Sequence, residues 1–189
     1  TYLDGRHPTN ITFTSAEKDA ERRDFTINGL FMNPDTLEII DFVNGLNDLK
    51  KGIVKSIGEP NHRFSEDHLR MLRAVRFAHT FDFDIDSETF RSIKKNAHNI
   101  SIVSAERIES ELSRILIESQ KPGDALQTLH DIGLLKYILP EVEKLIGVEQ
   151  PPDHHPEGDV FTHIKLMLNL SKTSEINANY SKRELVYSI

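Results

Sequence analysis

The spacing of hydrophobic residues changes along the chain, from short runs before Phe64 to a helical period after it. Apolar runs bounded by Gly, Pro, Asn and Asp predict strands, and they cover residues 11–13, 37–42 and 53–57. We therefore expect strands and turns, with one short helix among them, in the first 60 residues.

Apolar residues three and four positions apart predict a series of helices after Phe64. Ser65 followed by two acidic residues is typical of a helix start, and Asp86 or Ser87 is expected to cap a later helix. The Ser, Thr and Asn content of residues 169–181 predicts a loop before a last apolar stretch. The fold class expected is α+β, mostly α, and the expected helices cover residues 65–77, 89–97, 105–118, 123–132 and 135–145.

The helix expected over residues 65–77 has one core face and one charged face. At about 100° per residue, the apolar side carries Leu69, Met71, Leu72 and Val75. Arg76 falls near Leu69, so helical spacing alone assigns it no role. The opposite side, within roughly 120°, carries Glu66, Asp67, Arg70, Arg73, Ala74 and Phe77.

Asp67 and Arg70 are three residues apart, which makes them neighbours on a helix surface. The carboxylate only accepts hydrogen bonds and the guanidinium only donates them. Cytosine and adenine both present an amine donor beside a ring-nitrogen acceptor, whereas uracil and guanine present the reverse. The pair could therefore select C and A, since a wrong base leaves polar groups unpaired. The alternative is a surface ion pair worth about 0.2–0.5 kcal/mol.

A second charged segment, Arg22-Arg23-Asp24, precedes a short apolar run. Arginine forks suit phosphates and carboxylates bind hydroxyls, so Arg23 could contact a phosphate or ribose and Asp24 a ribose hydroxyl. The alternative is a solvated helix start with Asp24 near its positive end.

Four segments together, in order and spacing, resemble the family of class II tRNA nucleotidyltransferases and bacterial poly(A) polymerases. The resemblance continues through residues 133–135 and 139–141, so it covers nearly the whole chain. Four ordered motifs are far more specific than any single one. The four segments are residues 22–28, which contain Arg-Arg-Asp, residues 41–49, residues 66–77, which contain Glu-Asp-x-x-Arg, and residues 106–112.

The resemblance implies which residues contact the nucleotide. In this family the Arg-Arg-Asp motif meets the ribose and phosphates, and the Glu-Asp-x-x-Arg motif reads the incoming base. Glu66 would orient its neighbours. In residues 106–112, acids and an arginine three and four positions apart indicate a solvated helix face, and the resemblance implies that this region is structural support. The implied nucleotide-binding residues are Arg23, Asp24, Asn28, Glu66, Asp67, Arg70, Arg73 and Arg76.

The resemblance also implies a domain order and an activity. Residues 1–60 would end a polymerase-β-like nucleotidyltransferase head, residues 61–145 would form a helical neck that selects the base and binds RNA, and residues 146–189 would start an HD-like helical body. The activity implied is addition of CCA to tRNA 3′ ends from CTP and ATP. Alternatives are a poly(A) polymerase or a relative that adds only A or only C, and a noncatalytic nucleotide- or RNA-binding module.

The family's Asp-x-Asp, which holds Mg²⁺, is expected upstream of Arg22. We therefore expect the chain to begin inside the catalytic domain and to lack transfer activity alone, with Mg²⁺ held mainly by other residues. Asp82, Asp84 and Asp86 follow the Glu-Asp-x-x-Arg motif instead of preceding the Arg-Arg-Asp motif, so they are rejected as a substitute.

A histidine-rich segment, residues 153–163, resembles the entry to an HD-type metal-dependent phosphohydrolase domain. His163 matches the first histidine of that motif and could bind a second divalent metal. The His-Asp pair expected downstream does not occur before Ile189, so an HD-type hydrolase and a vestigial domain both stay open.

Composition narrows the function further. The 189 residues include no cysteine, which excludes a disulfide framework and thiolate metal sites. A net charge of −7 argues against binding nucleic acid over the whole surface, so RNA contacts should be local. With no export signal and no apolar run of about 18 residues, we expect a cytoplasmic protein without membrane contact. The sequence does not indicate the oligomeric state.

Overall fold

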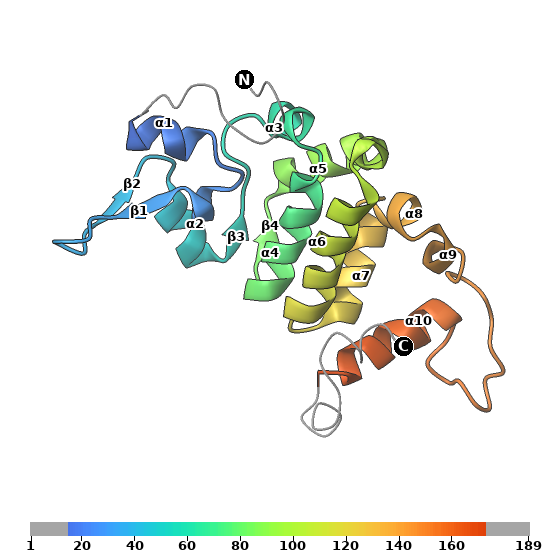
Figure 1. Ribbon diagram of the computed structural model, residues 1–189. Helices are drawn as coiled ribbons and strands as arrows, with labels where there is room; N and C mark the ends of the chain where they lie inside the picture. Colours follow the sequence, from blue (N-terminus) through green and yellow to red (C-terminus); the bar gives the residue numbers. More distant parts are fainter. Residues whose placement is uncertain (1–14, 173–189) are drawn as a thin grey trace.

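The computed structural model describes residues 15–172, and these form a mostly helical α+β structure, as expected (Figure 1). The first part holds two helices where one short helix was expected, together with a 3₁₀ turn and short strands. β1 and β2 pair antiparallel, with Leu30 opposite Asp41. The elements in order are α1 (Ala16–Glu21), η1 (Thr26–Asn28), β1 (Leu30–Met32), β2 (Ile39–Asp41), α2 (Gly45–Lys51) and β3 (Ile53–Val54).

Two of the three strand predictions are confirmed in position but not in length. The strand expected over residues 37–42 is β2, and the one expected over residues 53–57 is β3, which pairs in parallel with the later β4 (Asp84–Ile85). Ser56, beyond β3, forms a single bridge with Phe25. The strand expected at residues 11–13 lies outside the described residues.

The second part is helical, and α4, α6 and α7 pack side by side at its centre (Figure 1). Asp86 caps α5, as predicted, by accepting hydrogen bonds from the backbone of Glu88 and Thr89. The loop expected at residues 169–181 lies largely outside the described part of the chain. The helical elements are α3 (Pro60–Glu66), α4 (Arg70–Phe81), α5 (Ser87–Asn96), η2 (Ala97–Ile102), α6 (Ala105–Glu118), α7 (Pro122–Asp131), α8 (Leu135–Ile138), α9 (Pro140–Glu143) and α10 (Val160–Leu170).

Two of the expected helices are each divided in two. The helix start predicted at Ser65 is wrong, because Ser65 lies inside α3, which begins at Pro60. The helix predicted over residues 65–77 is interrupted at Asp67, whose backbone is extended (φ −152°, ψ 105°). Its side chain accepts a hydrogen bond from Leu69 N (3.1 Å), a local bond that competes with helix continuation. The helix predicted over residues 135–145 is divided at Pro140, which has no N–H to donate and starts α9.

The core face predicted for the helix over residues 65–77 is confirmed in α4. Met71, Leu72 and Val75 of α4 are fully buried, together with Ile115 of α6 and Leu129 of α7. These apolar contacts hold one side of α4 in the core. Its opposite, charged side faces the first part of the chain, where Arg73 contacts Asp24. Within the described residues, none of the helices has the length and apolar character needed to cross a membrane.

Candidate functional site

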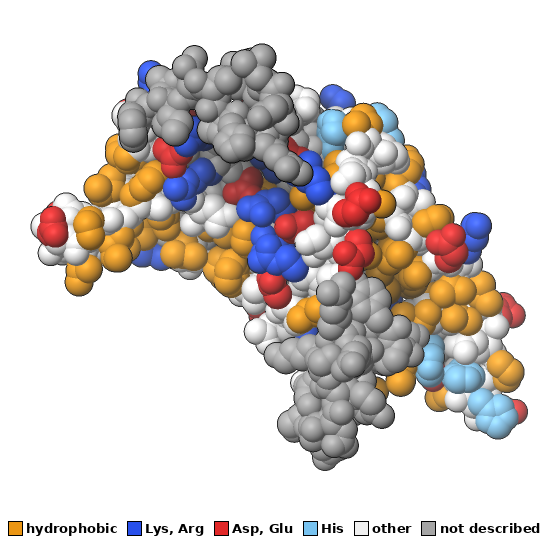
Figure 2. Space-filling view, in the orientation of Figure 1, with side chains coloured by type: hydrophobic (Ala, Val, Ile, Leu, Met, Phe, Trp, Pro, Cys, Tyr) orange, Lys and Arg blue, Asp and Glu red, His pale blue; other side chains and the backbone are white. Residues whose placement is uncertain are grey.

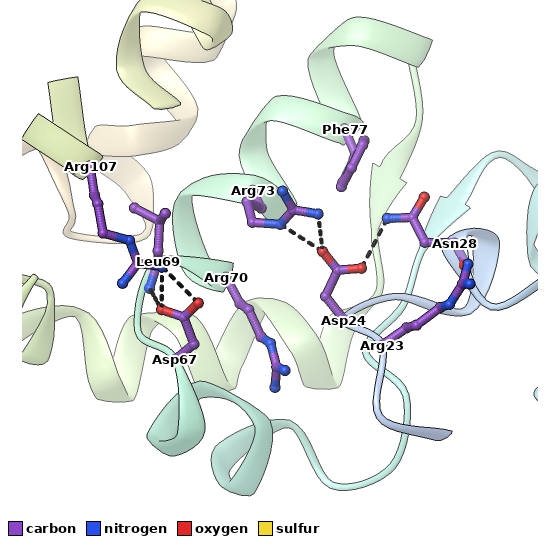
Figure 3. Close-up of a pocket in the computed structure, with 9 residues that line it drawn as sticks. All are labelled: Arg23, Asp24, Asn28, Asp67, Leu69, Arg70, Arg73, Phe77 and Arg107. Atoms are coloured by element: carbon purple, nitrogen blue, oxygen red, sulfur yellow. Dashed lines mark hydrogen bonds and ion pairs between the residues drawn. The ribbon is translucent and has the colours of Figure 1, made fainter. Parts of the chain in front are cut away.

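A cavity of about 550 Å³ lies where the turn after α1, the junction of α3 with α4, and α6 come together. Figure 2 shows basic and acidic side chains gathered near the middle of this face of the molecule. Six of the eight predicted nucleotide-binding residues line the cavity. The full lining is Arg23, Asp24, Asn28, Asp67, Leu69, Arg70, Arg73, Phe77 and Arg107 (Figure 3).

Asp24 connects the Arg-Arg-Asp segment to α4. One carboxylate oxygen accepts hydrogen bonds from Phe25 N and Asn28 Nδ2, both at 2.9 Å, and the other accepts from Arg73 Nε at 2.7 Å. Asp24 is only 8% exposed, so this buried charge is compensated by the guanidinium and by two neutral donors. The arrangement fixes the Arg73 guanidinium at the cavity wall (Figure 3).

Arg23 is held by its own segment. Its Nη1 donates to the Asn28 carbonyl at 2.7 Å, and its Nε and Nη2 donate to Asp19. The guanidinium lies 4.6 Å from the centre of the Phe31 ring. The side chain remains 40% exposed, so it can still meet an anion at the cavity mouth. The alternative of a solvated helix start is wrong for Asp24, because its side chain is buried and only the three-residue 3₁₀ turn η1 follows it.

Asp67 and Arg70 both line the cavity, but they do not form the pair expected from a continuous helix. Arg70 Nη1 donates to Glu66 Oε2 at 2.6 Å and to the Arg63 carbonyl at 3.0 Å. The Arg70 hydrogen bond, with help from Arg63, lowers the pKa of Glu66. The physical reason is the break at Asp67, which rotates its carboxylate away from the direction it would have in a helix.

Asp67 instead forms an ion pair with Arg107, a residue 40 positions later on α6. Arg107 Nη2 lies 2.9 Å and 3.2 Å from the two carboxylate oxygens. Both side chains are partly exposed, Asp67 by 34% and Arg107 by 53%. Such an exposed pair contributes only about 0.2–1 kcal/mol, so a ligand could replace it at small cost.

Sequence reasoning did not assign Arg107, Leu69 or Phe77 to the site. Charges three and four residues apart around Arg107 indicated a solvated scaffold helix, and no local signal identifies its contact with Asp67. The interpretation as a solvated face is wrong for Glu111, which is 7% exposed. Phe77 had a usable signal, because it falls on the charged side of the helical projection. Its ring lies 5.3 Å from the Arg73 guanidinium.

Arg76 and Glu66 do not line the cavity, although both were predicted to contact the nucleotide. Arg76 lies behind the wall, with a 5% exposed side chain. Its Nε is 2.9 Å from Glu111 Oε2 but not aligned for a hydrogen bond, and its Nη1 donates to Glu118 at 3.3 Å. Its guanidinium also covers the Phe77 ring at 4.4 Å. In this structure Arg76 therefore supports the wall from behind.

The described residues do not offer a fitting site for Mg²⁺ at this cavity. The two carboxylates that line it, Asp24 and Asp67, are each engaged by an arginine. The rejected Asp82–Asp86 segment has another use, because the Asp86 side chain is occupied in capping α5. His163 lies on α10, outside this cavity, where it contacts Glu157.

Family models match two parts of the chain. Residues 1–55 match the "Poly A polymerase head domain", and residues 82–146 match the "Probable RNA and SrmB-binding site of polymerase A". A CCA-adding enzyme of Ligilactobacillus salivarius is 46% identical over 138 residues, which are 72% of this chain and 34% of that protein. The chain thus spans about a third of the length of the curated relatives it matches.

Solved structures of CCA-adding enzymes have a fold similar to that of this chain. The CCA-adding enzyme of Bacillus stearothermophilus in complex with CTP aligns with a TM-score of 0.66 and 36% identity, covering 70% of this chain and 34% of that one. The Thermotoga maritima CCA-adding enzyme complexed with tRNA aligns with a TM-score of 0.61 and 29% identity, covering 91% of this chain and 46% of that one.

Proposed function

The chain belongs to the family of class II tRNA nucleotidyltransferases and bacterial poly(A) polymerases, and from this premise we propose that the protein adds CCA to tRNA 3′ ends from CTP and ATP. The observation that carries the proposal is the cavity, which residues of the Arg-Arg-Asp and Glu-Asp-x-x-Arg motifs line together. In this proposal the described residues bind and select the incoming nucleotide, in the cytoplasm where tRNA is processed.

Base selection follows from the donors and acceptors around Asp67. Its carboxylate accepts from the exocyclic amine that cytosine and adenine share, and a neighbouring guanidinium, Arg70 or Arg107, donates to the adjacent ring nitrogen. Uracil and guanine would set a carbonyl against the carboxylate and an N–H against the guanidinium, which leaves these polar groups unpaired. The Asp67–Arg107 ion pair is weak, so an incoming base can replace it by forming its own hydrogen bonds with these side chains.

The rest of the nucleotide would lie between α4 and the Arg-Arg-Asp segment. Arg73, oriented by Asp24, and Arg23 supply positive charge for the triphosphate, and Asn28 supplies a polar group for the ribose. Phe77 offers an aromatic surface beside them. In the reaction, the terminal hydroxyl of the RNA would attack the α-phosphate and pyrophosphate would leave. Mg²⁺, which the family resemblance implies, would need carboxylates other than those of this cavity.

A poly(A) polymerase is the second candidate, because the family model over residues 1–55 carries that description. The same carboxylate and guanidinium accept adenine, so the cavity supports either activity. A noncatalytic binding module would use the cavity without transfer, and an HD-type hydrolase would act elsewhere, near His163.

The test uses the full-length protein with Mg²⁺, the four nucleoside triphosphates and a tRNA that lacks its terminal CCA, and sequences the added nucleotides. We expect CCA from the wild type and loss of base selectivity from Asp67→Ala, by roughly 5- to 150-fold for one lost base contact. Asp131→Ala, an exposed residue of α7, is the matched control.

Other outcomes separate the candidates. A long A tail would identify a poly(A) polymerase, and no addition would contradict a transferase. Unchanged selectivity in Asp67→Ala would contradict the role proposed for this carboxylate. The 189 residues alone are expected to show no transfer, and Mg²⁺-dependent addition by them would refute that expectation.

A further inference from the structure

A carboxylate lies between two imidazole rings just before and within the first turn of α10. Glu157 Oε1 is 3.2 Å from His155 Nδ1 and 2.5 Å from His163 Nδ1. The two rings are 5.0 Å apart and nearly perpendicular, at 89°. The three residues are partly buried, and one potential ligand atom from each lies within 4.8 Å of the others.

The backbone around this cluster, His155, Glu157 and His163, is held by hydrogen bonds independent of the three side chains. Asp159 caps α10 by accepting from Thr162 N at 2.8 Å, and it also accepts from Gly147 N at 2.6 Å. Gly158, between Glu157 and the cap, has φ +124°, a conformation that residues with a side chain rarely adopt. The position of Glu157 between the histidines is therefore set by the backbone of this turn.

The donor set is informative about the ion that would fit. Two imidazoles and one carboxylate suit Zn²⁺, Co²⁺, Ni²⁺ or Fe²⁺, whereas Mg²⁺ and Ca²⁺ prefer oxygen ligands. Bonds of about 2.1 Å to a tetrahedral ion put ligand atoms about 3.4 Å apart, so the side chains need to move by less than about 1 Å.

We propose that His155, Glu157 and His163 form a three-ligand site for a divalent transition metal, with Zn²⁺ as the reference ion. Three protein ligands leave a coordination position for water or a small anion. The HD-type resemblance would complete a His163 site with residues further along the chain, whereas the structure supplies two ligands upstream of His163. The site lies on other elements than the nucleotide cavity, so it does not depend on the proposed transferase activity.

The test is a titration of the tag-free chain, first treated with chelator, with Co²⁺ and Zn²⁺. We expect one equivalent of Co²⁺ to produce visible absorption, and Zn²⁺ to displace it and to raise the unfolding temperature. His155→Gln and Glu157→Gln should each weaken binding by more than tenfold, since even outer-shell partners of a metal site contribute 10- to 100-fold. His154→Gln, an exposed neighbour outside the cluster, is the matched control and should bind as the wild type does.

Three results would overturn the proposal. One is the absence of saturable binding by the wild type at about 100 μM metal, which needs no variant and so is not affected by folding defects. Another is binding that His163→Gln weakens but His155→Gln and Glu157→Gln do not, which would assign His163 to a different ligand set. The third is an equal loss in His154→Gln. Circular dichroism of each variant without metal confirms that it is folded.

Discussion

Replacing Arg76 with methionine tests whether this arginine belongs to the support behind the cavity or to the nucleotide contact. Its side chain is 5% exposed and lies against the carboxylates of Glu111 and Glu118. Methionine retains most of the aliphatic volume, but it leaves the Glu111 carboxylate, 9% exposed, without its nearest cation. The change therefore removes a charge and a hydrogen-bond donor from a buried site.

The magnitude follows from the burial and geometry of the pair. Removing one partner of a buried ion pair costs about 3–5 kcal/mol, because the remaining charge is desolvated. The Arg76 Nε to Glu111 contact is not aligned as a hydrogen bond, and Arg73 and Arg114 remain 3.8 Å and 3.7 Å from Glu111. We therefore expect the lower end, about 3 kcal/mol, which lowers the unfolding temperature by roughly 6–12 °C for a chain of this size.

Urea unfolding followed by circular dichroism measures this loss, with Arg76→Met, Glu111→Gln and the double variant forming a cycle. The double variant should lose less than the sum of the two single variants. Arg91→Met, at an exposed position of α5, is the control and should change stability by less than about 0.5 kcal/mol. If Arg76→Met is as stable as the control but binds CTP more weakly, the buried-support interpretation is refuted and the nucleotide contact is favoured.

Two further substitutions test the close packing at Gly123 and the pH dependence of stability at His79. In Gly123→Ala the new Cβ would lie 2.1 Å from the Lys165 carbonyl oxygen of α10, so urea unfolding should show a loss of stability of about 1–3 kcal/mol. Helix propensity alone would instead stabilise α7. A gain in stability would therefore show that α7 and α10 are not in close contact. Burial lowers the pKa of His79 below its usual 6.5, although Asp124 and Asp82 oppose this. The unfolded chain therefore binds the proton first, and stability should fall as the pH drops below about 6.5. His79→Gln should show a smaller fall between pH 7 and 5, and identical pH profiles would contradict this account.

Features that depend on near neighbours were predictable from the sequence. The buried face of α4, with Met71, Leu72 and Val75, follows from side-chain period alone. The Asp86 cap and the bounds of α6 also follow from short-range signals. Six cavity residues were found through ordered motifs that resemble a known family.

Contacts between distant segments were not predictable. Asp24 meets Arg73 across 49 positions, and Asp67 meets Arg107 across 40. Each charged residue had several acceptable partners nearby, such as Arg70 for Asp67, and the differences between exposed pairs are below about 1 kcal/mol. The packing of α4 against α6, in which many apolar contacts act together, decides which charges meet.

The amino-acid sequence by itself determined the helical segments, their apolar faces and the chemical types available at the site, because these depend on local conformation and residue spacing. Only the tertiary structure decided that Asp67 pairs with Arg107, that Arg76 is buried, and that Glu157 lies between two histidines. These outcomes depend on backbone directions set by the whole core, which no local pattern of residues encodes.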